Sequence, residues 1–280
     1  MKIFQHCLLA CATVFVLSAC QTTTQSEDTA QSTPLAESWS MDSAHVRVEG
    51  KPYIVGQDTA ISTFNIVYPF IRSQDTTATK INSLVELRVK ELAWSWLGRD
   101  DAGDYQKQSL QWFGKEFVQM SEQDFAGMGT DAPVSAMSYE MELVGKVVYQ
   151  SPVFLSIQFD SYAYTGGAHP NSSTDMLHVS LQTGKELRQE DWIADTTALK
   201  KVAQSYFFAN EKKVDPSATP DLYFFGSEFT LPNSMAISDK GLRLIYSPYE
   251  AASYARGFIE FTIPFKDLKG ILRKEVIGLK

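Results

Sequence analysis

The sequence predicts an α+β fold in which mainly antiparallel sheets are flanked by a few helices. Several segments alternate apolar and polar residues with period two, which is typical of strands. Fewer segments repeat their apolar residues at helical spacing. Strands and helices do not alternate regularly, as they would in a parallel βαβ fold, and no repeat of solenoid period is visible.

The first 40 residues are predicted to lie outside the fold. A short apolar run has the shape of a secretory signal peptide and is too short to span a membrane. It ends in Leu17-Ser18-Ala19-Cys20, which resembles a lipobox, so we expect residues 1–19 to be removed and Cys20 to be acylated. An ordinary signal peptide with an incidental cysteine is the alternative. Residues 20–40 are polar and aperiodic, and they predict a flexible tether.

Export and a lipid anchor together predict a cell-envelope location. Gln21 follows the cysteine, and in lipoproteins of this kind that favours the outer membrane, facing the periplasm or the surface, if the source has two membranes. Cys7 and Cys11 fall in the segment to be removed, so no disulfide and no cysteine zinc site is expected. We expect no metal and no cofactor.

Residues 41–135 are predicted to form an N-terminal α+β region. Residues 64–70 alternate as a strand. Apolar side chains recur at helical spacing over residues 81–96 and predict a helix that stops at Gly98. Residues 110–120 predict a second amphipathic helix.

Two features of these helices are open to more than one interpretation. Gly114 lowers the helix propensity of the second helix at its centre. Trp94, Trp96 and Trp112 have the chemistry to line a sugar-binding groove, but packing of the helices on a sheet is the interpretation we favour.

Residues 136–280 are predicted to form a C-terminal α+β region. Residues 153–159 alternate as a strand buried on one face, and residues 199–207 have helical spacing, with Asp195 placed to cap the helix. Residues 223–225 (Tyr-Phe-Phe) are predicted to be an exposed aromatic cluster within a loop. The predicted strands are residues 141–148, 152–159, 176–181, 234–237, 242–246 and 258–263.

A turn-forming segment follows the strand that ends near Asp160. Gly166 and Gly167 accept positive φ values at little cost, and Pro170 and Asn171 suit a turn. The backbone is therefore predicted to reverse here and to hold a histidine beside the bend.

Residues 164–171 (Tyr-Thr-Gly-Gly-Ala-His-Pro-Asn) resemble the Tyr-x-Gly-Gly-Ala-His-Pro core of an extracytoplasmic domain. This domain is shared by RsiV-type lysozyme-sensing anti-sigma factors and the N-terminal region of PdaC-type peptidoglycan deacetylases. Residues 181–193 and 239–257 fit the same pattern in the same order. The resemblance covers roughly residues 45–275.

The resemblance implies the same α+β fold and a binding role at the envelope. The anti-sigma relatives bind lysozyme through this domain, whereas the deacetylase relatives carry a separate catalytic domain that this chain does not match. The chain shows neither a sigma-binding segment nor a transmembrane helix, so we expect that it does not carry a signal across a membrane alone.

A catalytic interpretation begins with His169, because a histidine beside a carboxylate can act as a general base. Asp160 and Asp175 are the nearest candidates in the sequence. The chain has no nucleophile elbow, no zinc-protease motif and no paired cysteine and histidine signature. We therefore expect a non-enzymatic protein in which His169 is a turn histidine bonded to backbone carbonyls, and we keep a hydrolase that uses His169 as a minor alternative.

A binding interpretation begins with charge and aromatic content. The formal net charge of −8 disfavours nucleic acid and favours a cationic partner. Tyrosines, a histidine and a glutamate on two turns supply groups that interface hot spots favour. The alternative is that these residues only shape the turns and cap the core. The candidate ligand-binding residues are Tyr162, Tyr164, Gly166, Gly167, His169, Pro170, Asn171, Pro248, Tyr249, Glu250 and Tyr254.

These features predict an envelope lipoprotein whose partner is a lysozyme-like muramidase that it sequesters, inhibits or senses. The alternative is an accessory module that binds peptidoglycan or another cell-wall glycan. Membrane contact is expected only through the N-terminal lipid.

Overall fold

A computed structural model describes residues 39–55, 57–98, 104–127 and 138–279. The predicted signal peptide, Cys20 and residues 21–38 of the predicted tether lie outside the described residues. Among the helices that are described, none is both long enough and apolar enough to cross a membrane.

A five-stranded sheet organises the first part of the chain. Its strand order is β1-β4-β5-β6-β7. All neighbouring strands are antiparallel except β4 and β5, which are parallel because two helices connect them. A small hairpin, β2 and β3, joins β1 to β4. The strands are β1 (Ser40–Glu49), β2 (Tyr53–Val55), β3 (Asp58–Ala60), β4 (Thr63–Arg72), β5 (Glu140–Gln150), β6 (Phe154–Tyr164) and β7 (Asn171–Ser180).

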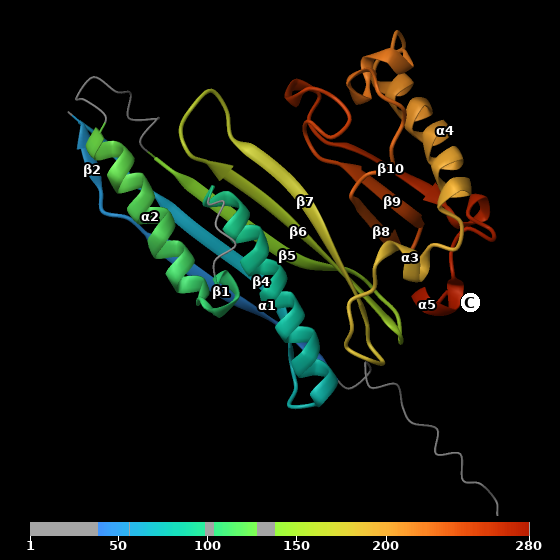
Figure 1. The fold of residues 1–280 in the computed structure, drawn as a ribbon, viewed down its shortest axis with the longest axis horizontal. Helices are drawn as coiled ribbons and strands as arrows, with labels where there is room; N and C mark the ends of the chain where they lie inside the picture. The colour runs from blue at the N-terminus through green and yellow to red at the C-terminus, as the bar shows by residue number, and fades with distance from the viewer. Residues whose placement is uncertain (1–38, 56, 99–103, 128–137, 280) are drawn as a thin grey trace, which may run out of the picture. The chain divides into compact units, whose positions relative to one another are not determined.

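Two helices cover one face of this sheet (Figure 1). Helix α1 (Thr76–Trp96) is capped by Asp75, whose carboxylate accepts the backbone N–H groups of Thr77 and Ala78. It ends before Gly98, which has a φ of 63°, as predicted. Helix α2 (Leu110–Gly127) follows the short 3-10 helix η2 (Tyr105–Lys107).

The tryptophans of these helices take part in helix packing. Trp94 of α1 stacks on Tyr105 of η2 and on Trp112 of α2, with ring centroids 5.7 and 6.5 Å apart. Trp96 packs against the same hydrophobic cluster. These contacts support the packing interpretation over a sugar-binding groove.

Gly114 allows α2 to approach the sheet closely. A Cβ atom at this position would overlap Val48 Cγ2 of β1 and lie 3.0 Å from Phe64 Cδ1 of β4. The residue that lowers helix propensity is therefore required by packing.

We expect Gly114→Ala to lower the free energy of unfolding by about 1–3 kcal/mol, because overpacking outweighs the gain of about 1 kcal/mol in helix propensity. Gly127→Ala is the matched control, since a Cβ at this last residue of α2 would meet nothing within 4 Å. Urea unfolding of both variants measures the difference. A Gly114→Ala protein as stable as the control would contradict the close approach.

The first half of β6 is buried on both faces, so the predicted burial on one face is wrong. Ile157 and Phe159 face the helices, but Phe154, Ser156 and Gln158 of the alternate set are also at most 5% exposed. The reason is that a second sheet packs against the face opposite the helices. The second half of β6 is not covered in this way by the second sheet, and its residues alternate between half-buried and buried.

The second sheet has three antiparallel strands in the order β10-β9-β8. Helix α4 lies beside it and packs on β10 (Figure 1). The predicted cap is confirmed, because the Asp195 carboxylate accepts the N–H of Ala198 at 2.8 Å. The elements are α3 (Gln189–Trp192), α4 (Thr196–Val214), β8 (Ser234–Ser238), β9 (Gly241–Tyr246), β10 (Ile259–Pro264) and α5 (Lys274–Ile277), with the 3-10 helices η4 (Pro220–Leu222), η5 (Phe224–Gly226), η6 (Tyr254–Arg256) and η7 (Phe265–Asp267).

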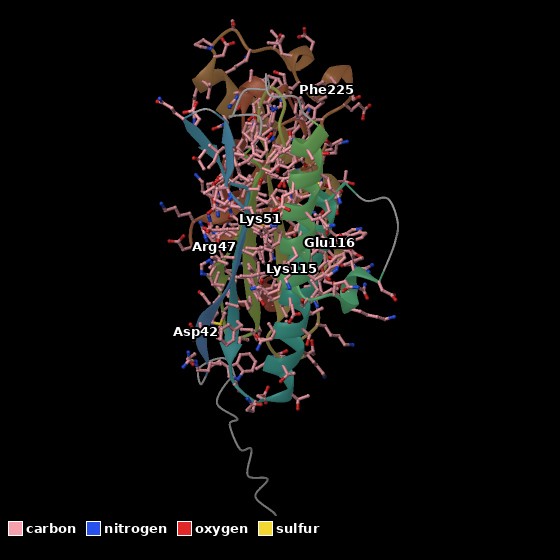
Figure 2. The ribbon with its side chains drawn as sticks, turned by 90° about the vertical axis from the view of Figure 1, so that its left-hand side faces the viewer. Asp42, Arg47, Lys51, Lys115, Glu116 and Phe225 are labelled. Carbon is pink, nitrogen blue, oxygen red and sulfur yellow. The ribbon has the colours of Figure 1, made fainter. Side chains whose placement is uncertain are left out.

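The aromatic cluster at residues 223–225 is mostly buried, so the prediction that it is exposed is wrong for two of its three members. Tyr223 and Phe224 are each 6% exposed and pack on Phe207 of α4, with ring centroids 5.1 Å away. Phe225 is 66% exposed (Figure 2). The Tyr223 and Phe224 side chains cover the hydrophobic core beneath this loop, which is why they are buried.

The hydrophobic residues form two clusters, which divide the chain near the end of β7 except that Phe154 of β6 belongs to the second cluster. One cluster joins α1 and α2 to the five-stranded sheet, and the other joins α3–α5 to the three-stranded sheet. The strands β1 and β4 of the predicted region 41–135 share a sheet with β5–β7 of the predicted region 136–280, and the division into these two regions stays a prediction.

His178 of β7 links the two sheets. Its Nε2 lies 2.9 Å from the carbonyl oxygen of Met235 on β8, so Nε2–H donates and the neutral ring is the form that fits. Its ring stacks on Phe154 at 5.4 Å. Burial lowers the pKa of His178 to about 4.

This burial predicts a loss of stability in mild acid. Between pH 6.5 and about 4 the unfolded chain binds a proton at His178 that the folded protein excludes. The free energy of unfolding should therefore fall as the pH falls through this window, by up to about 3 kcal/mol. His178→Gln removes this contribution, so wild type should lose stability relative to the variant between pH 7 and pH 4 in urea unfolding. Parallel stability curves would contradict the assignment.

Candidate functional site

The predicted reversal between β6 and β7 is present. Gly166 and Gly167 have φ values of 83° and 91°, which are strained for residues with a Cβ atom. The Tyr164 hydroxyl donates to the Gly167 carbonyl oxygen at 3.2 Å across the bend. Asn171 opens β7 opposite Ala163. The hairpin places His169 at its tip.

A second loop, residues 247–257, leaves β9 and approaches this hairpin. The Glu250 carboxylate accepts the N–H groups of Ser247 and Asn233 at 2.9 and 2.7 Å, so it fixes the bend and ties the loop to the residue before β8. The Ser247 hydroxyl in turn accepts the N–H of Thr174 on β7 at 3.1 Å. Pro248 is half-buried at the start of the bend. Both carboxylate oxygens of the candidate residue Glu250 therefore accept backbone N–H groups of this protein.

The two loops meet at three rings, His169, Tyr249 and Tyr254, which we call the His169 cluster. The His169 ring stacks on Tyr254 with centroids 3.8 Å apart and planes at 15°. His169 Nδ1 lies 2.9 Å from the Pro170 carbonyl oxygen and therefore donates to it. Nε2 is then the acceptor for the Tyr249 hydroxyl, 3.3 Å away and 80 residues later in the chain.

Tyr249 is the outermost member of the His169 cluster. Its side chain is 52% exposed, while His169 and Tyr254 are half-buried. Its φ is 71°, a conformation that is uncommon for a bulky residue and costs about 1–3 kcal/mol. A backbone that holds an exposed ring in a strained position is a feature of binding sites.

A buried ion pair connects the second loop to helix α4. Arg256 of η6 donates from Nε and Nη2 to the two carboxylate oxygens of Glu211 on α4, each at 2.7 Å. The Glu211 side chain is 1% exposed and also accepts the Tyr223 hydroxyl at 3.0 Å. Burial and this hydrogen bond raise the pKa of Tyr223 to about 12. Because η6 also carries Tyr254, this ion pair positions the His169 cluster.

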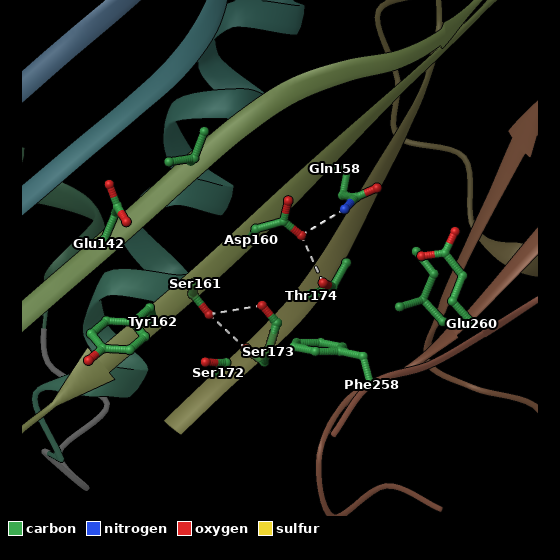
Figure 3. A pocket seen from close by; sticks show the side chains of 12 residues that line it. Glu142, Gln158, Asp160, Ser161, Tyr162, Ser172, Ser173, Thr174, Phe258 and Glu260 are labelled. Carbon is green, nitrogen blue, oxygen red and sulfur yellow. Dashed lines mark hydrogen bonds between the residues drawn. The ribbon is translucent and has the colours of Figure 1, made fainter. Parts of the chain in front are cut away.

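A pocket of about 430 Å³ lies beside these loops (Figure 3). Its floor is the helix-free face of β5, β6 and β7, and its opposite wall comes from β9, β10 and the residue before β10. Side chains that matter for its chemistry are Glu142, Asp160, Tyr162, Thr174, Phe258 and Glu260. Phe258 connects the pocket to the His169 cluster, because it lines the pocket and directly follows the second loop, which carries Tyr254. Burial and the nearby Glu140 carboxylate raise the pKa of the Tyr162 hydroxyl.

Two of the three pocket carboxylates are paired with cations. Asp160 accepts from Lys146 Nζ at 2.7 Å and from the Thr174 hydroxyl at 2.8 Å. Burial opposes its ionisation, but these hydrogen bonds and one from Gln158 outweigh burial and lower the pKa of Asp160. Glu260 pairs with Arg243 at 2.8 Å.

The groups considered for catalysis are not assembled. His169 bonds to Pro170 and Tyr249, whereas Asp160 pairs with Lys146 and Asp175 with Arg88 Nη1 at 2.7 Å. In the described part of the chain, no hydrogen bond joins His169 to a carboxylate. No three His, Cys, Asp or Glu side chains of the described residues gather in a way that could hold a metal ion.

Sequence reasoning found both loops but not the pocket or the ion pair behind them. Glu211 and Arg256 are 45 residues apart and carry no spacing signal. Glu142 alternates with core residues of β5, which places it on the open face but does not show what covers that face.

The fold and the two-loop site define an α+β protein with two adjoining sheets, and comparisons with known proteins agree with this description. Residues 55–172 match the family model described as Deacetylase PdaC, and residues 184–266 match the model described as Protein of unknown function (DUF3298). The first match covers most of the first hydrophobic cluster, and the second match covers most of the second. These PdaC-like and DUF3298 regions suggest an envelope-associated accessory module.

Two solved structures share the fold. A DUF3298 family member from Bacteroides fragilis NCTC 9343 is 17% identical, with a TM-score of 0.61, and the match covers 86% of this chain and 96% of that one. A DUF3298 family protein from Pseudomonas aeruginosa PAO1 is 18% identical, with a TM-score of 0.56 and coverage of 85% and 97%. No curated protein matches the chain. The PdaC part of the predicted resemblance is thus confirmed, while the RsiV part stays a prediction.

Proposed function

We propose that this protein is a non-enzymatic, lipid-anchored envelope protein that binds a lysozyme-like muramidase and thereby sequesters, inhibits or senses it. Cys20 is the proposed lipidation site, and the outer membrane is the proposed location. The binding surface is the His169 cluster with the adjoining Tyr162 and Tyr164.

The main support for this proposal is that the β6–β7 hairpin and the loop at residues 247–257, which are distant in the sequence, meet at the His169 cluster. Tyr249 is exposed and strained, and its hydroxyl is aimed by His169 at 3.3 Å. Rigid aromatic anchors lose little conformational entropy on binding, which is why Tyr is enriched in hot spots. A core-capping role alone does not require the ring to be 52% exposed.

Charge supports a basic protein as the ligand. The chain has a formal net charge of −8, and lysozymes are commonly strongly basic. Opposite net charges accelerate encounter and suppress other acidic partners.

A cell-wall glycan is the second candidate, and the pocket is the observation that favours it. Tyr162 and Phe258 offer ring surfaces beside the hydroxyl groups of Ser172 and Thr174. Pockets that combine apolar rings with a few polar groups are typical of small-molecule sites. A sugar unit of peptidoglycan is a ligand of this kind.

Two binding assays on residues 21–280 separate the candidates. Biolayer interferometry with hen egg-white lysozyme should show saturable binding, and cytochrome c, another basic protein, should not bind at the same salt concentration. Sedimentation with insoluble peptidoglycan tests the glycan. Binding to the wall polymer without binding to lysozyme would reject the muramidase proposal and favour the alternative.

A further inference from the structure

We propose that the 430 Å³ pocket receives a lysine or arginine side chain of the bound protein. This inference rests on the proposed function, because it names the chemistry with which the same surface recognises its ligand. Glu142 and Glu140 of β5 supply the charge, and Tyr162 and Phe258 supply the apolar contact.

The first step is the arrangement of side chains across the open face of the sheet. Glu142 lies directly opposite Asn65 of β4 on one side and Tyr162 of β6 on the other, and Tyr162 lies opposite Ser172 of β7. These residues form one row across four strands, and Figure 3 shows Glu142 and Tyr162 at the same end of the pocket. Glu140 precedes Glu142 by two residues and so points to the same face.

The second step is charge. Asp160 and Glu260 are already paired with Lys146 and Arg243. Glu142 accepts only a long amide contact from Asn65, at 3.5 Å. Among the described residues, no Lys, Arg or His nitrogen lies within 4.0 Å of the Glu140 or Glu142 carboxylates. Glu142 therefore places one carboxylate in this end of the pocket, and Glu140 places a second one beside it on the same face of β5.

The third step is the shape of the cationic group. Lysine and arginine carry an apolar stem that packs on rings, while the charged end stays near a carboxylate. An ammonium or guanidinium over a tyrosine or phenylalanine ring gains about 0.5–1 kcal/mol at an exposed site. Phe258 is 41% exposed and Tyr162 is half-buried, so both rings have open surface.

The fourth step is the source of the cation. Phe258 lines the pocket and lies four residues after Tyr254, so the pocket adjoins the His169 cluster. A basic protein that contacts Tyr249 and Tyr254 therefore has its surface beside the mouth of the pocket. A protruding lysine or arginine of that protein meets the Glu142 carboxylate, with Glu140 beside it, without rearrangement of either loop.

The test uses residues 21–280 labelled with ¹⁵N and the probe Nα-acetyl-lysine methylamide. Backbone shifts are expected at Glu142, Tyr162, Ser172 and Phe258, and the Nε-acetylated probe, which has no charge, should bind at least fivefold more weakly. Glu140→Gln with Glu142→Gln should weaken binding of the charged probe about three- to tenfold. Glu228→Gln is the matched control, because the Glu228 side chain is 97% exposed and does not line the pocket. Equal binding of both probes, or shifts elsewhere, would overturn the inference.

The same variants measured against lysozyme keep this inference distinct from the proposed function. If wild type and the double variant bind lysozyme equally well, the pocket assignment is wrong while the muramidase proposal stands. If the charged probe occupies the pocket but wild type does not bind lysozyme, the pocket chemistry is supported and the muramidase proposal is wrong.

Discussion

Replacing Glu211 by alanine is expected to lower the free energy of unfolding by about 3–5 kcal/mol. The reason is that the Glu211 side chain is 1% exposed, and its loss leaves the Arg256 guanidinium without its bidentate partner. Removing one member of a buried ion pair leaves an uncompensated charge and costs this much. Urea unfolding followed by circular dichroism measures the change.

Glu260→Ala is the matched control, because Glu260 also pairs with an arginine, accepting Nε and Nη2 of Arg243 at one carboxylate oxygen, but its side chain is 47% exposed. Exposed pairs contribute about 0–1 kcal/mol, so this variant should stay close to wild type. Equal effects of the two substitutions would show that the Glu211 pair is solvated rather than buried.

A milder substitution connects this ion pair to binding. Glu211→Gln keeps the size of the side chain but removes the charge that holds Arg256 and thus η6. We expect the stacking of Tyr254 on His169 to loosen and lysozyme affinity to fall in a protein that is still folded. Unchanged affinity in a folded Glu211→Gln protein would limit the role of the pair to stability.

Much of the fold was accessible because single strands and helices carry their own patterns. Asp195 was recognised as a cap from its position before an apolar repeat, and the Gly166–Gly167 turn from its glycines. Strand β1 was missed although Ala44, Val46 and Val48 alternate with polar residues. Residues 41–49 were placed in the N-terminal α+β region, but no strand was predicted there because none of the alternating side chains is fully buried or strongly apolar on both sides.

What the sequence could not show depends on contacts between elements. The burial of Gln158 on the second face of β6 results from packing of the three-stranded sheet. The sequence pattern of β6 itself does not predict that this face is buried. Gly114 lowers the helix propensity of α2, and the reason for a glycine there is visible only from the close approach of β1. The two loops of the site were identified from turn residues, but their meeting at His169 depends on how the two sheets adjoin.

Replacing Tyr249 by alanine is expected to weaken lysozyme binding about 30-fold or more, which corresponds to the loss of about 2 kcal/mol at a hot spot. The free energy of unfolding should change by less than about 1 kcal/mol, because the side chain is 52% exposed. Tyr249→Gly should reduce binding as much, and it also removes the strain of a positive φ. Biolayer interferometry and urea unfolding measure the two quantities.

Phe225 provides the control for these variants. It is also an exposed aromatic residue, 66% accessible, with a positive φ of 51°, but it lies in η5 and not in the His169 cluster. Phe225→Ala should leave lysozyme binding unchanged. A large fall in stability of Tyr249→Ala would assign its ring to the core and remove it from the binding surface.

A double-mutant cycle with His169→Ala tests whether the loops act as one surface. His169 aims the Tyr249 hydroxyl and supports Tyr254 by stacking, so the effects of the two substitutions on binding should not add. We expect a coupling energy of about 0.5–3 kcal/mol, the range for residues in contact. Additive losses would mean that His169 and Tyr249 contribute to binding independently of each other. A coupled loss, in proteins of unchanged stability, would show that the two loops contact the ligand as one surface, as the contacts within the His169 cluster predict.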